Sequence, residues 1–280
     1  MPTTTVNGVQ LYWELTGNVG EPLVLVHGSW IDHRNWNPVI PFLSQSFRVL
    51  TYDRRGHSQS ERPTFQGCIR DDVADLAALI ETLGLTPAHI VGSSFGGSIV
   101  LRLAGERPEL FRSLIVNEPP LLGLLADEAD GKGVLHATKA RIAAVVERLE
   151  AGDMEAGTRL FVDTIIFGSG AWEQLPLELR QLVLYNAPTF LDEMHDPDAL
   201  SVDLARLHAF PHPALLTLSE EGPSFAPPIV EELAAVLPHA ERKIFVGMGH
   251  EPEQSHPEFY AATIVDFIMR VTSFPQRLSV

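Results

Sequence analysis

The sequence predicts an α/β protein with a mostly parallel central sheet flanked by helices. Short apolar runs alternate with segments of helical spacing, which is typical of parallel βαβ units. The runs are nearly continuous in apolar residues, as expected for strands that are covered on both faces. A third observation is the stretch of residues 121–210, which shows helical patterns and no convincing strand. With 280 residues, the chain can form one large domain that carries an insertion.

The first part of the chain supplies most of this rhythm. A helix is predicted at residues 71–83, where apolar residues recur at helical spacing and Gly84 follows in the usual position of a helix end. A second helix is predicted at residues 95–106, just before Pro108. Strands are predicted from apolar runs at residues 9–16, 23–27, 47–52, 88–92 and 110–117.

The insertion is predicted to be a helical cap, and the strand–helix rhythm returns after it. The cap helices are expected at residues 133–150, 154–167, 177–184 and 198–207. The later strands are expected at residues 214–219 and 242–246, and the later helices at residues 229–237 and 258–271. We therefore expect a core domain of residues 1–120 and 211–280 and a cap of residues 121–210. The cap stretch holds 15 acidic and 7 basic residues, so its net charge of −8 is half of the chain's −16.

Composition disfavours several classes of protein. Hydrophobic residues make up 45% and charged residues 20%, and no apolar run approaches the roughly 18 residues of a membrane helix. The net charge of −16 disfavours nucleic acid and anionic membranes as partners, because both would repel this surface. Cys68 is the only cysteine, and residues 1–8 lack the features of a secretory signal. We expect a cytoplasmic protein that acts on a small molecule, with a homodimer as a possible assembly.

The strongest chemical signal is Gly92-Ser93-Ser94-Phe95-Gly96-Gly97, which matches the pattern G-x-S-x-G. A predicted strand precedes it and a predicted helix follows it, so Ser94 would project from a sharp turn at the carboxyl edge of the sheet. Gly92 and Gly96 lack a Cβ and let neighbouring backbone pack against that turn. The amide of Phe95 would lie at the helix N-terminus, where unpaired N–H groups favour negative charge. Ser94 is the candidate nucleophile.

Two other strand ends supply partners for such a nucleophile. His27-Gly28-Ser29-Trp30 follows a predicted strand, and its glycine lets a loop backbone approach Ser94 and offer a second N–H to an oxyanion. Ser29 is the first candidate for this second donor, beside Phe95, and Trp30 is the alternative. Gly249-His250 follows the last predicted strand, and the imidazole of His250 is the candidate general base.

With these motifs in this order, the sequence resembles the α/β-hydrolase superfamily over nearly the whole chain. The resemblance also rests on residues 53–60, Asp-Arg-Arg-Gly-His-Ser-Gln-Ser, for which we expect a structural role beneath the site. It implies the α/β-hydrolase fold, with the cap inserted after the sixth strand. It also implies hydrolysis without a metal or an organic cofactor. The fold alone does not identify the substrate.

The triad acid departs from the commonest pattern of this superfamily. That acid usually follows the strand after the cap, but the expected position here is Gly222, in Ser219-Glu220-Glu221-Gly222-Pro223. The preferred acid is Glu118, which ends the strand before the cap. Certain haloalkane dehalogenases and the zearalenone-type lactonases are similar in placing their acid there. Glu220 or Glu221 is the alternative acid, and a site without a functional acid is the third alternative.

A weaker resemblance to the zearalenone-type lactonases concerns the substrate pocket. It rests on residues 168–172 of the cap, Gly-Ser-Gly-Ala-Trp, and on residues 249–257. Trp172 is therefore a candidate pocket wall, with an anchor between cap and core as an equal alternative. Further pocket candidates, each equally plausible as a core residue, are Trp30, Phe95, Phe190, Met194 and Met248.

Together these features predict a serine hydrolase that cleaves an ester or lactone of a medium-sized apolar substrate through an acyl-enzyme. Ser94, His250 and Glu118 would form the triad. A serine nucleophile disfavours the chemistry of epoxide hydrolases and haloalkane dehalogenases, which use a carboxylate. Carbon–carbon bond hydrolysis and cofactor-free haloperoxidase or perhydrolase activity are alternatives on the same triad. An alternative of another class is a ligand receptor that turns over slowly.

Overall fold

Within residues 2–126 and 131–273, which a computed structural model describes, eight strands form one sheet. Their order across the sheet is β1-β2-β4-β3-β5-β6-β7-β8. β2 pairs antiparallel with both β1 and β4, and all other neighbours are parallel. The strands are β1 (Thr3–Val6), β2 (Val9–Thr16), β3 (Pro22–Val26), β4 (Arg48–Tyr52), β5 (Ala88–Ser93), β6 (Phe111–Asn117), β7 (Ala214–Ser219) and β8 (Ala240–Phe245).

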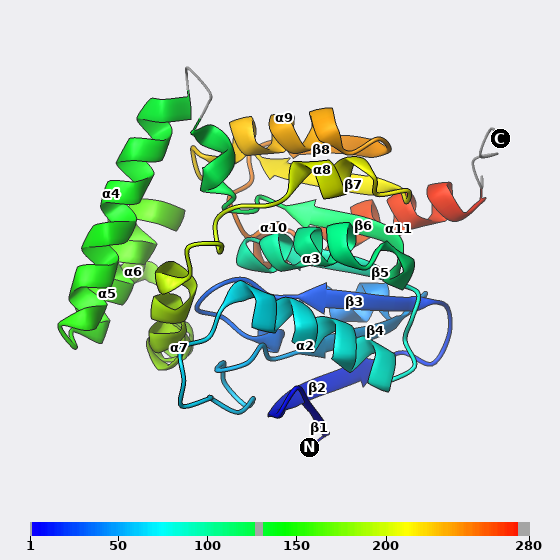
Figure 1. Cartoon of the computed structure of the whole chain (residues 1–280), viewed down its shortest axis with the longest axis horizontal. Helices are drawn as coiled ribbons and strands as arrows, with labels where there is room; N and C mark the ends of the chain where they lie inside the picture. Colours follow the sequence, from blue (N-terminus) through cyan, green and yellow to red (C-terminus); the bar gives the residue numbers. More distant parts are fainter. Residues whose placement is uncertain (1, 127–130, 274–280) are drawn as a thin grey trace.

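Helices cover both faces of this sheet (Figure 1). On one face the apolar cluster includes Ile90 and Val116, and on the other it includes Val91 and Ile115. Successive strand residues thus enter opposite clusters, which explains the continuous apolar runs and confirms the predicted α/β architecture. The first cluster is covered by α2 (Ile69–Thr82), α3 (Phe95–Glu106) and α9 (Ala226–Val236), and the second by α1 (Ile40–Leu43) and α11 (Pro257–Ser273).

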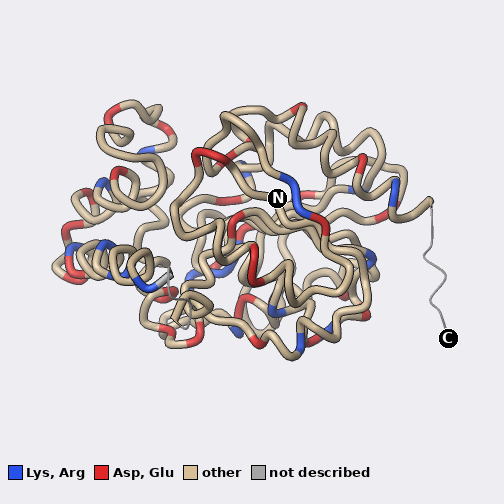
Figure 2. The backbone as a smooth tube through the Cα atoms, turned by 90° about the horizontal axis from the view of Figure 1, so that it is seen from above, with Lys and Arg blue, Asp and Glu red and all other residues tan. Residues whose placement is uncertain are grey.

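The cap is made of helices that lie beyond the ends of the parallel strands, at one side of the molecule (Figure 1). These helices are α4 (Gly131–Glu150), α5 (Met154–Phe161), α6 (Ala171–Gln174) and α7 (Leu177–His195), with a π-helix at Val162–Ile166 after α5. They enclose a third apolar cluster, which includes Trp172 and Phe190 of the cap and Trp30 of the core. Figure 2 shows acidic and basic residues interspersed along these helices.

The two ends of the predicted cap pack with the core instead. Leu121 and Leu122 at one end, and Leu207 and Phe210 at the other, belong to the main apolar cluster of the sheet. Helix α8 (Leu204–His208) contacts α3 and α9. Both ends of residues 121–210 thus contact the core, and α4 to α7 lie between them in the chain; the cap boundaries stay a prediction. Residues 127–130 of that prediction lie outside the described residues.

Helix α7 is longer than its sequence pattern predicts. The expected helix ends at Leu184, whereas α7 continues to His195 with Pro188 inside it. Proline lacks the N–H of a helical hydrogen bond and commonly ends a helix. The residues around it, including Phe190 and Glu193, are buried, so tertiary packing outweighs the local signal. Strand β1 and the short helices α1 and α6 also lacked a recognised pattern. None of the described helices has the length and apolar character needed to cross a membrane.

Candidate active site

Ser94 lies in the turn between β5 and α3, at the carboxyl edge of the sheet. Its φ of 53° and ψ of −125° are strained for a residue with a side chain, as expected where a strand turns directly into a helix. Close packing holds this turn. A Cβ on Gly92 would lie 2.5 Å from the carbonyl oxygen of Gly96, and a Cβ on Gly96 would overlap the carbonyl oxygen of Val26. The two glycines therefore have the packing role that the motif predicts.

His250 and Glu118 form a buried pair beside this turn. His250 lies in the loop between β8 and α10 (Pro252–Ser255), and Glu118 directly follows β6. The Nδ1 of His250 lies 2.5 Å from Oε2 of Glu118, and the exposed fractions are 4% and 0%. An ionised carboxylate only accepts, so Nδ1 donates and Nε2 is left as the acceptor of the ring. The backbone N–H of Ser219 donates to Oε1 of Glu118 at 2.7 Å, which fixes the carboxylate from its other side.

Gly222, the position at which the resemblance to the α/β-hydrolase superfamily would place the acid, lies directly against the carboxylate of Glu118. A Cβ on Gly222 would overlap Oε1 of Glu118 and lie 2.9 Å from its Cδ. A side chain at position 222 and the present Glu118 carboxylate are therefore mutually exclusive. The two alternative acids point elsewhere: Glu220 accepts a hydrogen bond from the backbone of Gly247 at 2.8 Å, and Glu221 borders a separate pocket.

We expect Gly222→Ala to lower the free energy of unfolding by about 1–3 kcal/mol, because its methyl group would be forced against a fully buried carboxylate. Urea-induced unfolding of the variant and the wild type measures this difference. Gly133→Ala in α4 is the matched control, since a Cβ there meets no atom within 4 Å. Equal stability of Gly222→Ala and the wild type would show that Glu118 does not fill this space.

Three carboxylates act on the pKa of His250. Burial by itself lowers this pKa, but the hydrogen bond of Glu118 and the charges of Glu118, Glu251 and Glu253 outweigh burial and raise it above the ordinary value. Burial in turn raises the pKa of Glu251, and it raises the pKa of Glu253 to about 7. The imidazole is thus more basic than a free histidine, which suits a group that takes up a proton.

The backbone donors predicted for an oxyanion lie next to Ser94. Phe95 is the first residue of α3, and Gly28 packs so closely that a Cβ on it would lie 3.0 Å from Cβ of Ser94. Ser29 and Trp30 follow Gly28 and line the same cavity as Ser94. Within the described residues, the N–H groups of Phe95, Ser29 and Trp30 donate no hydrogen bond to other protein groups. All three donors therefore remain available, and the choice between Ser29 and Trp30 stays a prediction.

Ser94 and His250 open into one cavity between the cap and the core. Its polar lining includes Ser29, Glu251 and Glu253, and no described Lys or Arg takes part. Its free volume of about 50 Å³ holds only a few water molecules. Its apolar lining is formed by Trp30, Ile31, Phe161, Val162, Ile166, Phe167, Leu175, Leu179 and Val183.

The predicted pocket residues divide into two groups. Trp30 lines the cavity, and its ring stacks on Phe161 at 4.8 Å between centroids. Phe95, Trp172, Phe190, Met194 and Met248 are not among the lining residues in this structure. Trp172 and Phe190 are buried in the cluster between cap and core, and Met194 packs against it. The alternative role of Trp172, an anchor between cap and core, therefore describes its position better than a pocket wall.

Sequence patterns missed three acids at this site, of which Glu193 and Glu253 are buried and Glu251 is half-buried. Glu251 and Glu253 follow His250 directly, and both line the cavity. Oε1 of Glu253 accepts from Asn35 at 2.8 Å, while its Oε2 is buried without a donor within the described residues. Glu193 reaches the core from α7, where it bonds Ser29 and Arg54. The position of Glu251 and Glu253 next to His250 in the sequence could have indicated a place at the site. No such indication exists for Glu193, because its partners are distant in the chain.

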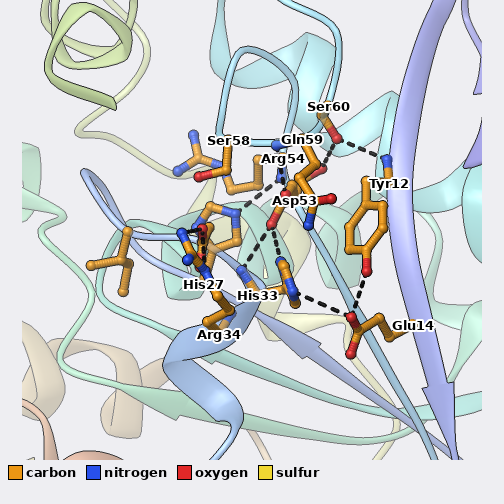
Figure 3. Close-up of polar contacts among 12 residues, drawn as sticks. Tyr12, Glu14, His27, His33, Arg34, Asp53, Arg54, Ser58, Gln59 and Ser60 are labelled. Atoms are coloured by element: carbon orange, nitrogen blue, oxygen red, sulfur yellow. Dashed lines mark hydrogen bonds and ion pairs between the residues drawn. The ribbon is translucent and has the colours of Figure 1, made fainter. Parts of the chain in front are cut away.

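Asp53 ties together the loops beneath the site (Figure 3). Its Oδ1 accepts from the backbone N–H of His33 at 2.9 Å and lies 2.5 Å from Nδ1 of the same residue, and its Oδ2 accepts from the backbone of Gln59. Among the described residues, Asp32, His33 and Asp53 could together approach a metal ion. Asp32 is paired with Arg34, however, and Asp53 with His33, so these atoms already have protein partners.

Comparisons with known proteins agree with this architecture. A sequence profile described as the alpha/beta hydrolase family matches residues 23–263. A protein assigned as a carbamate hydrolase in Pantoea ananatis is 27% identical over 277 residues, which cover 95% of both chains. An (E)-2-((N-methylformamido)methylene)succinate hydrolase of Acinetobacter baylyi is 31% identical over 170 residues, which cover 60% of this chain and 58% of that protein.

A solved structure, the enol-lactonase from Burkholderia xenovorans, superposes with a TM-score of 0.79 over 96% of this chain and 100% of its own. At 21% identity this likeness shows the fold alone. The matched part of this chain covers 30% and 58% of the length of the first two curated relatives, which is less than two thirds in both cases.

Proposed function

This chain belongs to the alpha/beta hydrolase family, and from that membership we propose that it is a serine hydrolase of carboxylic esters or lactones. One observation carries the proposal: a buried imidazole, paired at 2.5 Å with the carboxylate of Glu118, borders the same cavity as Ser94 in its strained turn. Such a set activates a hydroxyl that would otherwise be a weak nucleophile.

In the proposed reaction, Oγ of Ser94 attacks the carbonyl carbon while Nε2 of His250 takes the hydroxyl proton. Glu118 keeps the other ring nitrogen protonated and stabilises the imidazolium that forms. The N–H groups of Phe95 and Ser29 donate to the developing oxyanion. His250 then gives its proton to the leaving alcohol, and it activates the water that releases the acid from Ser94.

The lining of the cavity supports a neutral substrate with an apolar body. Its walls are aliphatic and aromatic, and the described lining offers carboxyl groups but no cation to an anionic substrate. The full-length similarity to a protein assigned as a carbamate hydrolase favours carbamates as a second candidate substrate. A carbamate would be attacked at the same carbonyl carbon by the same groups.

The test is a hydrolysis screen of p-nitrophenyl esters, lactones, carbamates and carbon–carbon cleavage substrates, with Ser94→Ala as the blank. Hydrolysis of esters or lactones that depends on Ser94 supports the proposal. Turnover confined to carbamates would select the second candidate. Turnover confined to carbon–carbon bonds would contradict both.

We expect kcat/KM to fall as the pH drops through a value above the ordinary histidine pKa of about 6.5, because His250 must be neutral to accept a proton. Glu251→Gln should move this acid limb to lower pH, since it removes a negative charge that raises the pKa of His250. A pH profile of kcat/KM measures both effects. Glu258→Gln, at an exposed position on α11, is the control that should leave the limb in place. A limb that stays or rises in Glu251→Gln would contradict this account.

A further inference from the structure

The cap contributes one buried carboxylate to the core that the proposed mechanism does not use. Glu193 lies on α7 and is 4% exposed. Its Oε2 accepts from the hydroxyl of Ser29 at 2.5 Å, and its Oε1 accepts from both terminal nitrogens of Arg54 at 3.0 Å. Arg54 is itself 1% exposed and is held from its other side by Asp72 at 3.1 Å. Glu193 is therefore joined to Ser29 directly and to a rigid buried guanidinium.

Arg54 also contacts the backbone of the loop that follows β3 and contains Gly28 and Ser29, here called the oxyanion loop. Its Nη1 donates to the carbonyl oxygen of Gly28 at 3.2 Å, and Nδ1 of His27 lies 2.8 Å from the same oxygen. The carbonyl of Gly28 and the N–H of Ser29 belong to one planar peptide group, so a fixed carbonyl also fixes the direction of the N–H. The guanidinium lies 4.7 Å from the ring centroid of Phe95 as well. Arg54 thus contacts Phe95 and the Gly28 end of the peptide group that carries the Ser29 N–H.

We propose that Glu193 is a positioning residue of the oxyanion hole, which aligns the Gly28–Ser29 peptide only while the cap is closed. The inference rests on the proposed function. Glu193 contacts this segment in two ways. It accepts a hydrogen bond from the Ser29 hydroxyl, and it pairs with Arg54, which donates to the Gly28 carbonyl. Hydrogen bonds to charged groups in a dry interior are short and directional, and an oxyanion donor is effective only when it is aimed in advance.

The small size of the cavity relates the contacts of Glu193 to the entry of the substrate. A free volume of about 50 Å³ is too small for a medium-sized ester, and we infer that the cap residues that line the cavity, which include Phe161 and Val183, move outward when such a substrate enters. Movement of α7 away from the core separates Glu193 from Ser29 and Arg54. Closure over the substrate restores both contacts. The complete oxyanion hole is thereby tied to the closed, water-excluding state.

The test compares Glu193→Gln, Ser29→Ala and the double variant in p-nitrophenyl butyrate hydrolysis. Glu193→Gln should lower kcat about 10- to 100-fold, part of the loss known for removal of a whole oxyanion donor, with KM changed less than about threefold. Ser29→Ala keeps the backbone N–H and loses only the hydrogen bond from the Ser29 hydroxyl to Glu193. It should therefore lower kcat as well. The two losses should not multiply in the double variant, because both break one contact.

A second readout reports on the oxyanion itself. Phenylboronic acid forms a tetrahedral adduct with a nucleophilic serine, and its affinity should fall by the same factor as kcat in Glu193→Gln. Asp196→Asn is the matched control: it removes a carboxylate directly after α7 that accepts from the backbone N–H of Ile69 at 2.8 Å and, within the described residues, makes no hydrogen bond to Gly28, Ser29 or Arg54. This control should keep both kcat and boronate affinity.

Several outcomes would overturn the proposal. A higher KM at unchanged kcat in Glu193→Gln would make Glu193 a support of the pocket, and equal losses in Asp196→Asn would make it a general brace of the cap. Losses that multiply in the double variant would separate Glu193 from Ser29. If Glu193→Gln does not fold, Ser29→Ala alone tests the proposal. An unchanged kcat in Ser29→Ala would then overturn it. If the wild type shows no hydrolysis that depends on Ser94, the proposed function itself is contradicted. This result is distinguishable from the others because it needs no variant of Glu193 or Ser29.

Discussion

Replacing Ser94 with alanine is expected to lower kcat for ester hydrolysis by about a million-fold, to a level still above the uncatalysed rate. The substitution removes the nucleophile, while the N–H groups of Phe95 and Ser29 and the cavity stay in place to bind the substrate. Alanine also tolerates the turn as well as serine does, so the variant should fold. Steady-state hydrolysis of p-nitrophenyl esters, corrected for the spontaneous rate, measures the loss.

Ser98→Ala is the matched control for this result. Ser98 lies on the same helix as the turn, and its hydroxyl is buried without a partner within the described residues. Its removal should therefore leave kcat within about twofold, as expected for a substitution that removes no contact. A wild type that binds apolar esters but shows no turnover dependent on Ser94 would favour the ligand receptor over the enzyme.

Glu118→Gln is expected to lower kcat by about ten thousand-fold, the loss associated with the wrong histidine tautomer in a triad. The glutamine oxygen can still accept from the N–H of Ser219, and its amide then presents donors to Nδ1 of His250. That arrangement moves the ring proton to Nε2, where it blocks proton transfer from Ser94. Steady-state kinetics with the same esters measures kcat for this variant.

Glu220→Gln and Glu221→Gln provide the comparison on the alternative acids. Glu220 bonds the backbone of Gly247 and Glu221 borders another pocket, so both variants should keep kcat within a few-fold of the wild type. A larger loss in either of them than in Glu118→Gln would contradict the assignment of Glu118. Unfolding midpoints of all three variants separate a loss of chemistry from a loss of structure.

Most of the core could be predicted because its signals are local. The helix at residues 95–106 was predicted with its observed bounds, and β2 and β7 likewise, since apolar spacing and nearby glycine or proline define such elements. The helices of the cap region were predicted less accurately. The end segments of residues 121–210 pack with the sheet, and α7 runs through Pro188, because contacts between segments distant in the chain decide how these residues fold.

Ser94 and His250 could be recognised from the sequence because their chemistry depends on short motifs: a glycine-flanked turn after one strand and a loop after another. The partner of His250 could not be decided in this way. Glu118 and Gly222 lie more than a hundred residues apart, and only their packing shows that one carboxylate fills the space left by a glycine. Glu193 is a still clearer case, since nothing in its surroundings in the chain relates it to Ser29 or Arg54.

The sequence by itself determined the fold class, through the alternation of strand and helix patterns along the chain, and it indicated the serine turn and the candidate base, because each of these two depends on a short motif of neighbouring residues. The tertiary structure decided which carboxylate reaches the imidazole, which side chains line the cavity and how the cap touches the oxyanion loop. The physical reason is that these features depend on excluded volume and on buried charges that need partners. Both act between segments that only the folded chain brings together.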